Sequence, residues 1–409
     1  MGGSGMHTLT ILAILVLAAI QGTGGEFVFA TSKRGYEKLL KLEIQQAYGD
    51  KLKFAFSRPG LLTFKTDDAA TVDSFYRRQH AHSLTFLRSS GKSIPTQVAS
   101  TAEIIEQVKG LSQSRPLCLH VFGREEEEGL RSEHPQVGID RKARINACRN
   151  ELLSLAPELF AASSSSPDHK AGAKAAVNDI VLDVCVGEAG EKIFLGQHMH
   201  LEGPGTVGST GYANNLLPFL EMPSEAPSRA YMKMENAITY FGLPVLPQEQ
   251  ALEIGSAPGG CVYSLLQRGL RVCGVDPCPA DRTHSPVVKK SKDFIEVRSF
   301  LRNLRIEQVP ARAEWILCDA NAPPEELLPY LLNMCAHYQQ SLKGMLYTVK
   351  INDKLYDGLK PDRLLAYLQE TRDCVVGASG GALFSEVSML TLPANRQEVL
   401  IMAKTKLCK

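Results

Sequence analysis

Three charged residues directly follow short apolar runs that have the composition of buried strands. Asp276 follows residues 270–275, Asp319 follows Trp315–Cys318, and Lys350 follows Met345–Val349. Burying an unpaired charge is costly, so a charge beside a buried strand indicates a polar role. The carboxyl ends of parallel strands meet at one edge of a sheet, where ligands bind in a crevice. The three side chains are therefore candidates for one site.

A glycine-rich turn precedes the first of these charges. Residues 252–260 read LEIGSAPGG, and a helical run 262–267 and a second strand 270–275 follow. Strand, glycine turn, helix, strand and carboxylate form the βαβ unit of nucleotide-binding α/β folds, in which the carboxylate can accept both ribose hydroxyls of an adenosine. The GxGxxG spacing that binds a pyrophosphate is absent, which favours S-adenosylmethionine as the ligand. The predicted cofactor-binding residues are Gly255, Ala257, Pro258, Gly259, Gly260, Asp276 and Asp319.

The turn Ser256–Gly260 resembles the loop of the FtsJ/RrmJ-type ribose 2'-O-methyltransferases. Further segments are similar to a THUMP-containing bacterial branch of this family that methylates a cytidine of large-subunit (23S) rRNA: 226–235, 315–319, 348–350 and 385–387. The resemblance covers most of the chain from Glu26 and is strongest from Ala226 onward. It implies an α/β, Rossmann-like S-adenosylmethionine-dependent methyltransferase domain preceded by small α+β domains, ferredoxin-like and THUMP-like, that bind RNA.

The resemblance also implies a catalytic tetrad at Lys233, Asp319, Lys350 and Glu386. A ribose hydroxyl is a poor nucleophile at neutral pH and needs a positioned base when it attacks the sulfonium methyl group. We expect Lys350 to be that base, because partial burial and the nearby charge of Lys233 would favour its neutral form. Asp319 would orient Lys350, and Glu386 would hold the second lysine and the ribose.

The sequence departs from the family pattern at three places. The acidic residue that touches the adenine in the family has no counterpart in 297–302, Cys261 replaces an aromatic residue, and Ala230 replaces a serine. Two alternatives therefore stay open: the same chemistry on tRNA or capped mRNA, and an RNA-binding pseudoenzyme or ribosome assembly factor. Base methylation is disfavoured, since the chain shows neither a cysteine-nucleophile motif nor an Asn/Asp-Pro-Pro-Tyr segment.

The pattern of apolar residues, taken with the resemblance, predicts three domains. The ferredoxin-like domain covers 26–95, with a strand at 26–30, a helix at 36–44 and a hairpin around Pro59-Gly60. The THUMP-like domain covers 96–207, with helices at 102–108 and 140–155 and paired strands at 180–186 and 192–196. The methyltransferase domain covers 208–409 and closes with a hairpin of 386–392 and 398–403. Basic residues of the second helix form either an RNA-binding face or a solvated one: Arg141, Lys142, Arg144 and Arg149.

Composition limits where RNA could bind. Among 409 residues, 45 Lys and Arg nearly balance 44 Asp and Glu, so any RNA contact depends on local basic patches. The 10 cysteines form no CxxC pair, which predicts reduced thiols and neither disulfides nor a metal site.

The N-terminus (1–25) contains an apolar run, 9–20, that is shorter than the roughly 20 residues of a spanning helix, so no stable membrane association is expected. This segment is either a targeting leader or an extension outside the folded core. The expected location is cytoplasmic or, with a leader, an organelle with a bacterial-type ribosome. The oligomeric state stays open.

Overall fold

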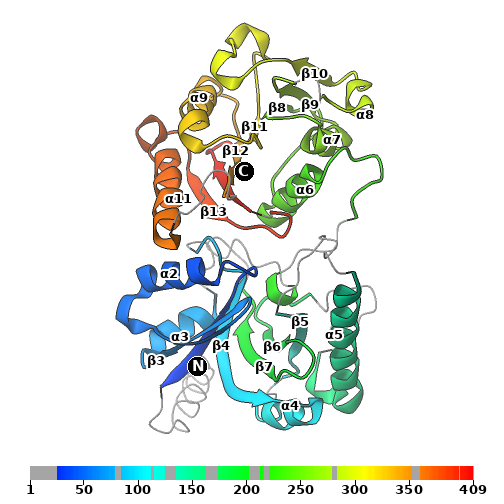
Figure 1. The fold of residues 1–409 in the computed structure, drawn as a ribbon, viewed down its shortest axis with the longest axis vertical. Helices are drawn as coiled ribbons and strands as arrows, with labels where there is room; N and C mark the ends of the chain where they lie inside the picture. Colours follow the sequence, from blue (N-terminus) through cyan, green and yellow to red (C-terminus); the bar gives the residue numbers. More distant parts are fainter. Residues whose placement is uncertain are drawn as a thin grey trace, which may run out of the picture.

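The computed structural model describes residues 25–78, 84–111, 115–124, 135–161, 174–201, 212–215, 221–278, 283–351, 360–395 and 397–408. Figure 1 shows two units along the long axis, each built around one sheet. Within these residues each sheet has seven strands, in the orders β2-β3-β1-β4-β7-β6-β5 and β10-β9-β8-β11-β12-β14-β13. The chain completes the first sheet before it begins the second, so the two units are consecutive in sequence.

The first sheet is formed by strands β1 to β7. They cover Glu26–Thr31, Lys53–Arg58, Leu61–Thr66, Ser89–Val98, Cys118–Gly123, Ile180–Val186 and Ile193–Met199. Helices α2 (Glu37–Tyr48), α3 (Ala69–Tyr76), α4 (Thr101–Val108) and α5 (Pro135–Leu155) pack with it. The predicted hairpin around Pro59-Gly60 is confirmed as β2 and β3, and the predicted strand pair as antiparallel β6 and β7.

Strand β4 joins the strands of the first unit into one continuous sheet, which the sequence did not predict. It pairs with β1 on one side and with β7 on the other, and the expected domain boundary at 95/96 falls within it. The segments expected to form two separate small domains therefore share one sheet. The physical reason is that both edges of this 10-residue strand are hydrogen-bonded, one to each segment.

The second sheet has the predicted α/β architecture. Its strands β8 to β14 cover Gln250–Ile254, Arg271–Val275, Phe294–Val297, Trp315–Cys318, Gly344–Lys350, Glu386–Leu390 and Glu398–Lys404. Its helices are α6 (Ala230–Phe241), α7 (Gly260–Gln267), α8 (Pro286–Lys289), α9 (Pro324–His337) and α11 (Pro361–Val376). Strands β8 to β12 run parallel, whereas β14 lies antiparallel between β12 and β13 and so closes the sheet with a hairpin.

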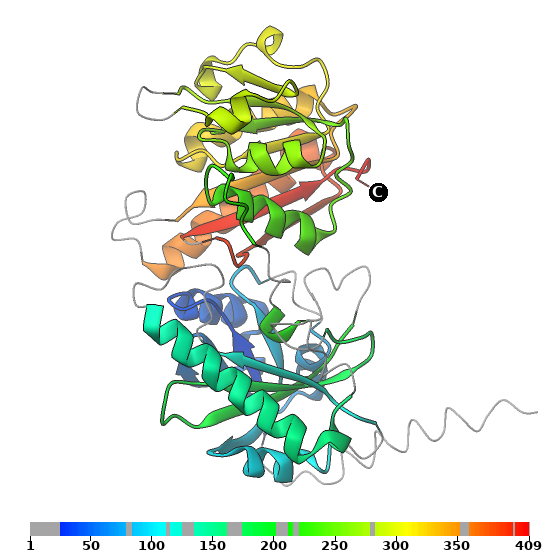
Figure 2. The same ribbon diagram turned by 90° about the vertical axis from the view of Figure 1, so that its right-hand side faces the viewer.

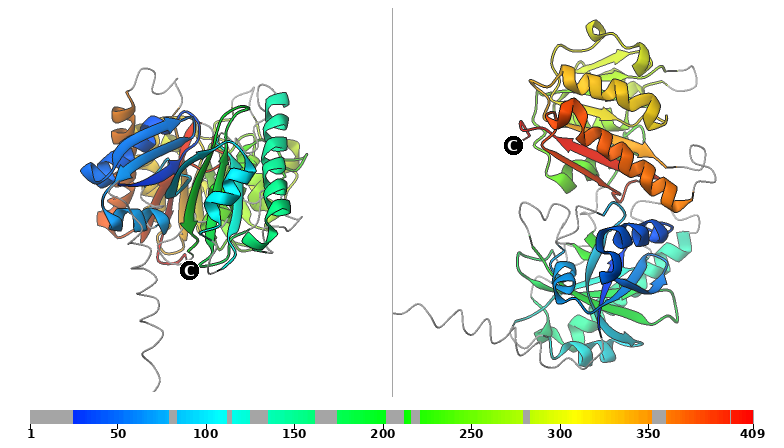
Figure 3. Two further views of the ribbon diagram at one scale, coloured as in Figure 1. Left: turned by 90° about the horizontal axis from the view of Figure 1, so that it is seen from below. Right: turned by 90° about the vertical axis from the view of Figure 1, so that its left-hand side faces the viewer.

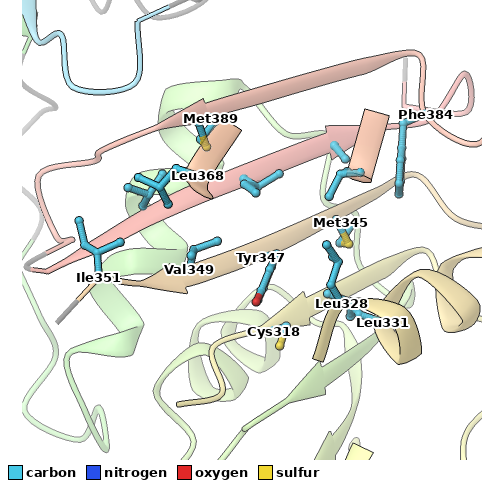
Figure 4. Packing of buried hydrophobic residues seen from close by; sticks show 14 of the residues in the cluster. Cys318, Leu328, Leu331, Met345, Tyr347, Val349, Ile351, Leu368, Phe384 and Met389 are labelled. Atoms are coloured by element: carbon cyan, nitrogen blue, oxygen red, sulfur yellow. The ribbon is translucent and has the colours of Figure 1, made fainter. Parts of the chain in front are cut away.

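Apolar residues cover both faces of the second sheet. Alternate residues of β12, such as Met345 and Val349, belong to one apolar cluster with Leu368 of α11 (Figure 4). Leu346 belongs to the cluster on the opposite face, with residues of α6 and α7. A strand buried on both faces reads as a continuous apolar run, as 345–349 does. Charged residues at the ends of such strands are thereby held on a rigid frame.

The two units lie against each other through α2 and α11, as Figures 1 and 3 show. Figure 2, turned by 90°, also places the first sheet beneath the second along the long axis. The apolar cluster around Leu368 includes Leu40 and Phe86 of the first unit, so their contact is partly hydrophobic.

Several sequence-based expectations fall outside the described residues. The N-terminal apolar run is among them, as are the side chain of Arg141 and any contact that it makes. Within the ranges that the structure covers, no helix combines the length and apolarity needed to cross a bilayer.

Glu43 gives a test of how α2 packs against the segment that precedes β4. Its buried carboxylate accepts hydrogen bonds from the backbone amides of Thr85 and Phe86 at 2.8 and 3.0 Å, and burial raises its pKa from 4.5 to about 7. A raised pKa means that the folded state holds the proton more tightly than the unfolded state, so stability falls as pH rises from about 4.5 through 7.

We expect Glu43→Gln to remove this titration. Urea unfolding at pH 5 and pH 8 should show the variant gaining stability relative to wild type at the higher pH, by up to about 3 kcal/mol. A stability difference that is the same at both pH values would contradict the assignment.

Candidate active site

Four charged side chains meet at one edge of the second sheet, and each comes from a different element. Lys233 projects from α6, Asp319 follows β11, Lys350 ends β12, and Glu398 begins β14. Asp319 and Lys350 stand at the carboxyl ends of parallel strands, as predicted. Three of the four residues predicted as a tetrad are therefore together, and the fourth member is new.

The four side chains alternate in charge around a ring. Lys233 Nζ lies 3.0 Å from Asp319 Oδ2 and 2.8 Å from Glu398 Oε1. Lys350 Nζ lies 2.5 Å from Asp319 Oδ1 and 2.8 Å from the same Glu398 oxygen. Each side chain is at most 18% exposed. Two ammonium groups balance two carboxylates, so a burial that would be prohibitive for one charge is tolerated.

The ring controls the protonation of its members. Burial disfavours the charged form of Lys233, but the negative charges of Asp319 and Glu398 outweigh it and raise the pKa of Lys233. Burial likewise raises the pKa of Glu398, but the positive charges of Lys350 and Lys233 outweigh it and leave that pKa lowered. Lys233 is therefore a fixed cation and Glu398 a fixed anion at neutral pH.

Glu386 does not belong to this ring, so the prediction that it holds the second lysine is wrong. Its carboxylate is 42% exposed and pairs with Lys404 at 3.6 Å. The reason is strand register: Glu398 is the partner of Lys350 across β12 and β14, whereas Glu386 is the partner of Lys404 at the other end of β14.

The sequence contained a signal for the correct residue. Both strands of the closing hairpin begin with Glu-Val, at 386 and at 398. Only the strand that lies next to β12 can bring its first residue to the end of that strand. The order of the last two strands therefore decides between the two glutamates.

Buried polar contacts fix α6, which carries Lys233. Glu235 on this helix accepts hydrogen bonds from Ser264 at 2.6 Å and from Arg268 at 2.7 Å. Asn236 accepts one from the backbone amide of Ala394 at 3.0 Å, in the turn before β14. The helix is thus tied both to α7 and to the hairpin that carries Glu398.

A cavity of about 570 Å³ opens beside the ring, within the roughly 300–1,000 Å³ usual for ligand sites. Lys233, Asp319 and Glu398 line it together with most of the predicted cofactor residues: Gly255, Ala257, Pro258, Gly260 and Asp276. Gly259 is absent from this lining. A Cβ there would lie 2.9 Å from Val288, so this glycine serves the packing of the loop on α8.

Two glycines in the cavity lining allow close packing of the chain segments around it. Gly255 has a φ of +75°, and a Cβ there would lie 2.6 Å from the backbone of Ala320, which follows Asp319. A Cβ at Gly260 would lie 2.3 Å from Ser228 Oγ. The chain segments around the cavity therefore approach one another more closely than any side chain would allow.

Two buried carboxylates face the cavity. Asp276 is fully buried, and its oxygens accept hydrogen bonds from the backbone amides of Ala257 at 3.2 Å and Cys278 at 2.8 Å. Glu253 on β8 is 1% exposed, and its Oε2 has no hydrogen-bond partner among the described atoms. Burial, followed by the charge of Asp319, raises the pKa of Glu253 well above its usual range.

Sequence reasoning missed Glu253, although the signal was present. A glutamate within the apolar strand LEI, two residues before Gly255, is a charge at a buried position. A buried carboxylate oxygen without a hydrogen-bond partner, on a residue that lines a cavity, indicates a cationic ligand group. Where the family's acidic residue is missing, Ser299, Phe300 and Leu301 line the cavity.

Two clusters in the described ranges contain residue types that bind metals, but the first already holds a cation. It comprises His120, Asp183 and His198. The guanidinium of Arg78 lies 2.9 Å from His198 Nδ1 and 3.8 Å from Asp183, where a metal ion would be repelled.

The second cluster comprises Cys278, His284 and Glu296. His284 bridges Ser256 at 2.8 Å and Glu296 at 2.9 Å. These hydrogen bonds tie Ser256 in the glycine-rich turn to Glu296 on β10.

The FtsJ-like methyltransferase family matches residues 226–347 of this chain. This part of the chain is an FtsJ-like methyltransferase domain. The match includes α6, the glycine-rich turn and β8 to β11, together with most of β12. The match accordingly includes Lys233 and Asp319, and it ends before Lys350 and the closing hairpin, which belong to the same sheet.

Two similar proteins share the name "Ribosomal RNA large subunit methyltransferase M". The protein from Shewanella loihica is 31% identical over 146 residues, which cover 32% of this chain and 38% of that protein. The protein from Shewanella woodyi is 23% identical over 312 residues, which cover 73% of this chain and 78% of that protein. The crystal structure of TrmN from Thermus thermophilus aligns with 93% of this chain and 99% of its own, at 13% identity and a TM-score of 0.33.

Gly255 gives a structural test of the methyltransferase domain, with Gly242 as its matched control. Both have positive φ, but a Cβ at Gly242 meets nothing within 4 Å. Gly242→Ala should lower the free energy of unfolding only by the strain of a left-handed alanine, about 1–2 kcal/mol. Gly255→Ala should cost about 1–3 kcal/mol more, because the new methyl group overlaps Ala320.

Urea unfolding of both variants checks this comparison. Equal losses of stability would show that the turn at Gly255 and the segment after β11 are not in close contact.

Proposed function

We propose that this protein transfers the methyl group of S-adenosylmethionine to the 2'-hydroxyl of a ribose in large-subunit ribosomal RNA, at a cytidine. The observation that carries the proposal is the ring of Lys233, Asp319, Lys350 and Glu398 beside the cavity of the methyltransferase domain. The name shared by the two Shewanella proteins supports the choice of RNA.

The residues of the cavity fit this cofactor. The orphaned oxygen of buried Glu253 matches the cationic ammonium of its methionine part. Asp276, which follows β9 and lines the cavity, would accept its ribose hydroxyls, and the turn at Gly255 and Gly260, also part of the lining, would lie along it. When bound, the cofactor supplies an electrophilic methyl group on a positively charged sulfur atom.

Lys350 is the proposed base. Its Nζ is in contact with Asp319 and Glu398, which hold it at the edge of the cavity. As the oxygen bonds to the methyl group, the bond between that group and sulfur breaks, and the neutral amine of Lys350 takes the proton of the ribose hydroxyl. The proton passes to solvent after the methylated RNA leaves.

The other members orient the reactants. Lys233, a fixed cation, keeps Asp319 and Glu398 apart and in place. Asp319 also lines the cavity, so it links the position of the base to that of the methyl donor. Holding reacting atoms in a near-attack geometry can contribute about 7–11 kcal/mol to catalysis.

The first unit is the proposed RNA-binding part. Its ferredoxin-like and THUMP-like segments would read the RNA by shape and by unpaired bases, as is usual for RNA recognition. The reaction would take place where the RNA is found, in the cytoplasm or in an organelle with a bacterial-type ribosome.

The test is methyl transfer from labelled S-adenosylmethionine to unmodified large-subunit rRNA, with tRNA as the comparison. A ribose methyl makes the adjoining phosphodiester bond resistant to alkali, which maps the product to one nucleotide. Label at an alkali-resistant cytidine supports the proposal. Label only in tRNA would overturn the substrate, and cofactor binding without transfer to any RNA would favour a pseudoenzyme.

In that assay, Glu398→Gln and Glu386→Gln form a matched pair. Glu398→Gln removes the anion that both lysines share, so transfer should fall by at least about 100-fold. Glu386→Gln should stay within about twofold of wild type, because Glu386 pairs only with Lys404 at the far end of β14. The reverse order of effects would restore Glu386 as the fourth member.

Glu253 should couple cofactor binding to pH. Its raised pKa favours the protonated form in the free protein, and pairing with the ligand's ammonium ionises it, so binding releases a proton and tightens as pH rises. Titration calorimetry in two buffers of different ionisation enthalpy measures that proton. Glu253→Gln should abolish the release and weaken binding by about 10- to 100-fold. Unchanged cofactor affinity in Glu253→Gln would show that the ammonium group binds elsewhere. Glu386→Gln, which alters a carboxylate outside the cavity lining, is the control.

A further inference from the structure

The first unit reaches the ring of charges directly. The loop between β1 and α2, residues 32–36, lies at the turn of the hairpin formed by β13 and β14, and two of its side chains contact that hairpin. At the same hairpin, the backbone amide of Thr391 donates a hydrogen bond to the carbonyl of Thr85 at 3.0 Å, and further contacts between the units join α2 and α11. One is the hydrogen bond from Gln369 on α11 to Gln46 on α2, at 2.8 Å on the surface.

Lys33 is the first of these two side chains. It is only 7% exposed, and its ammonium donates a hydrogen bond to the backbone carbonyl of Asn395 at 2.9 Å. Asn395, itself 2% exposed, holds the turn by accepting a hydrogen bond from the amide of Leu392 at 2.9 Å. Its Nδ2 lies 3.4 Å from Glu398 Oε2. A chain of polar contacts therefore leads from Lys33 to the ring.

Each oxygen of Glu398 has a separate task. Oε1 accepts hydrogen bonds from both Lys233 and Lys350, whereas Oε2 faces Asn395. A rotation of the carboxylate that lost the contact at Oε2 would also move Oε1 away from the two lysines. The turn that carries Asn395 thus sets the orientation of Glu398.

Tyr36 is the second side chain. Burial and then the negative charge of Glu398 raise its pKa, and a hydrogen bond with the backbone of Glu398 opposes them. The phenol therefore lies against the first residue of β14. Lys33 and Tyr36 approach the start of this strand from the first unit, one through the turn and one directly.

We propose that Lys33 and Tyr36 are positioning residues for the methyl-transfer reaction, which hold the turn before β14 so that Glu398 keeps both lysines in place. The first unit then completes the active site in addition to binding RNA. Because Lys33 is buried, its role differs from that of a surface lysine that contacts phosphates. The proposal rests on the proposed function, and one of its tests does not need turnover.

The first test measures kinetics of the full chain. Lys33→Met should lower kcat by about 10- to 100-fold, as small misplacements of catalytic groups do, with KM for rRNA and cofactor affinity within about twofold of wild type. Lys33→Arg, which keeps a cationic donor, should recover most of kcat. Gln46→Ala breaks a contact between the units away from the ring and should leave kcat unchanged.

Three outcomes would overturn the proposal. An unchanged kcat in Lys33→Met would show that the turn holds itself. A rise in KM for rRNA alone would make Lys33 an RNA contact, and an equal loss in Gln46→Ala would assign the effect to general docking of the units. If Lys33→Met does not fold, Tyr36→Phe takes its place under the same criteria.

Hydrogen exchange provides the test that needs no turnover. Relative to wild type and Gln46→Ala, Lys33→Met should speed amide exchange at the start of β14 and leave the start of β13 unchanged. Unaltered exchange there would overturn the proposal even in an active protein. Conversely, wild type could prove inactive while Lys33→Met still exchanges faster than wild type at the start of β14. That result would contradict the proposed function, but it would keep the conclusion that Lys33 holds the turn before β14.

Discussion

The alternation of two lysines and two carboxylates at the edge of the second sheet is the interaction on which the account depends. None of the four charges could be buried there alone, and together they are neutral. The arrangement requires β11, β12 and β14 to be adjacent and α6 to be held over them. Removing one member leaves a net charge at a largely buried site, so the fold and the chemistry constrain each other.

Much of the fold of the second unit could be predicted because its signals are local. The apolar runs at 315–318 and 345–349 become β11 and β12, and the glycine-rich turn lies between β8 and α7, as expected. Residues at the carboxyl ends of parallel strands were brought together because that edge is a property of the topology. Asp319 and Lys350 follow from this rule alone.

What could not be predicted depends on contacts between distant segments. Choosing Glu398 over Glu386 requires the order of the last two strands, which both begin with Glu-Val. The continuity of the first sheet depends on β4 pairing on both edges, which no local pattern encodes. Glu253 was overlooked because a single polar residue in an apolar strand is visible, but its missing partner is a property of the folded cavity.

The most direct test of the central claim is an experimental structure of the protein with S-adenosylmethionine bound. We predict that the ligand's ammonium pairs with Glu253, that its ribose hydroxyls bind Asp276, and that its methyl group points toward Lys350 at the ring of charges. A methyl group directed away from the ring, or a cofactor bound outside this cavity, would contradict the account.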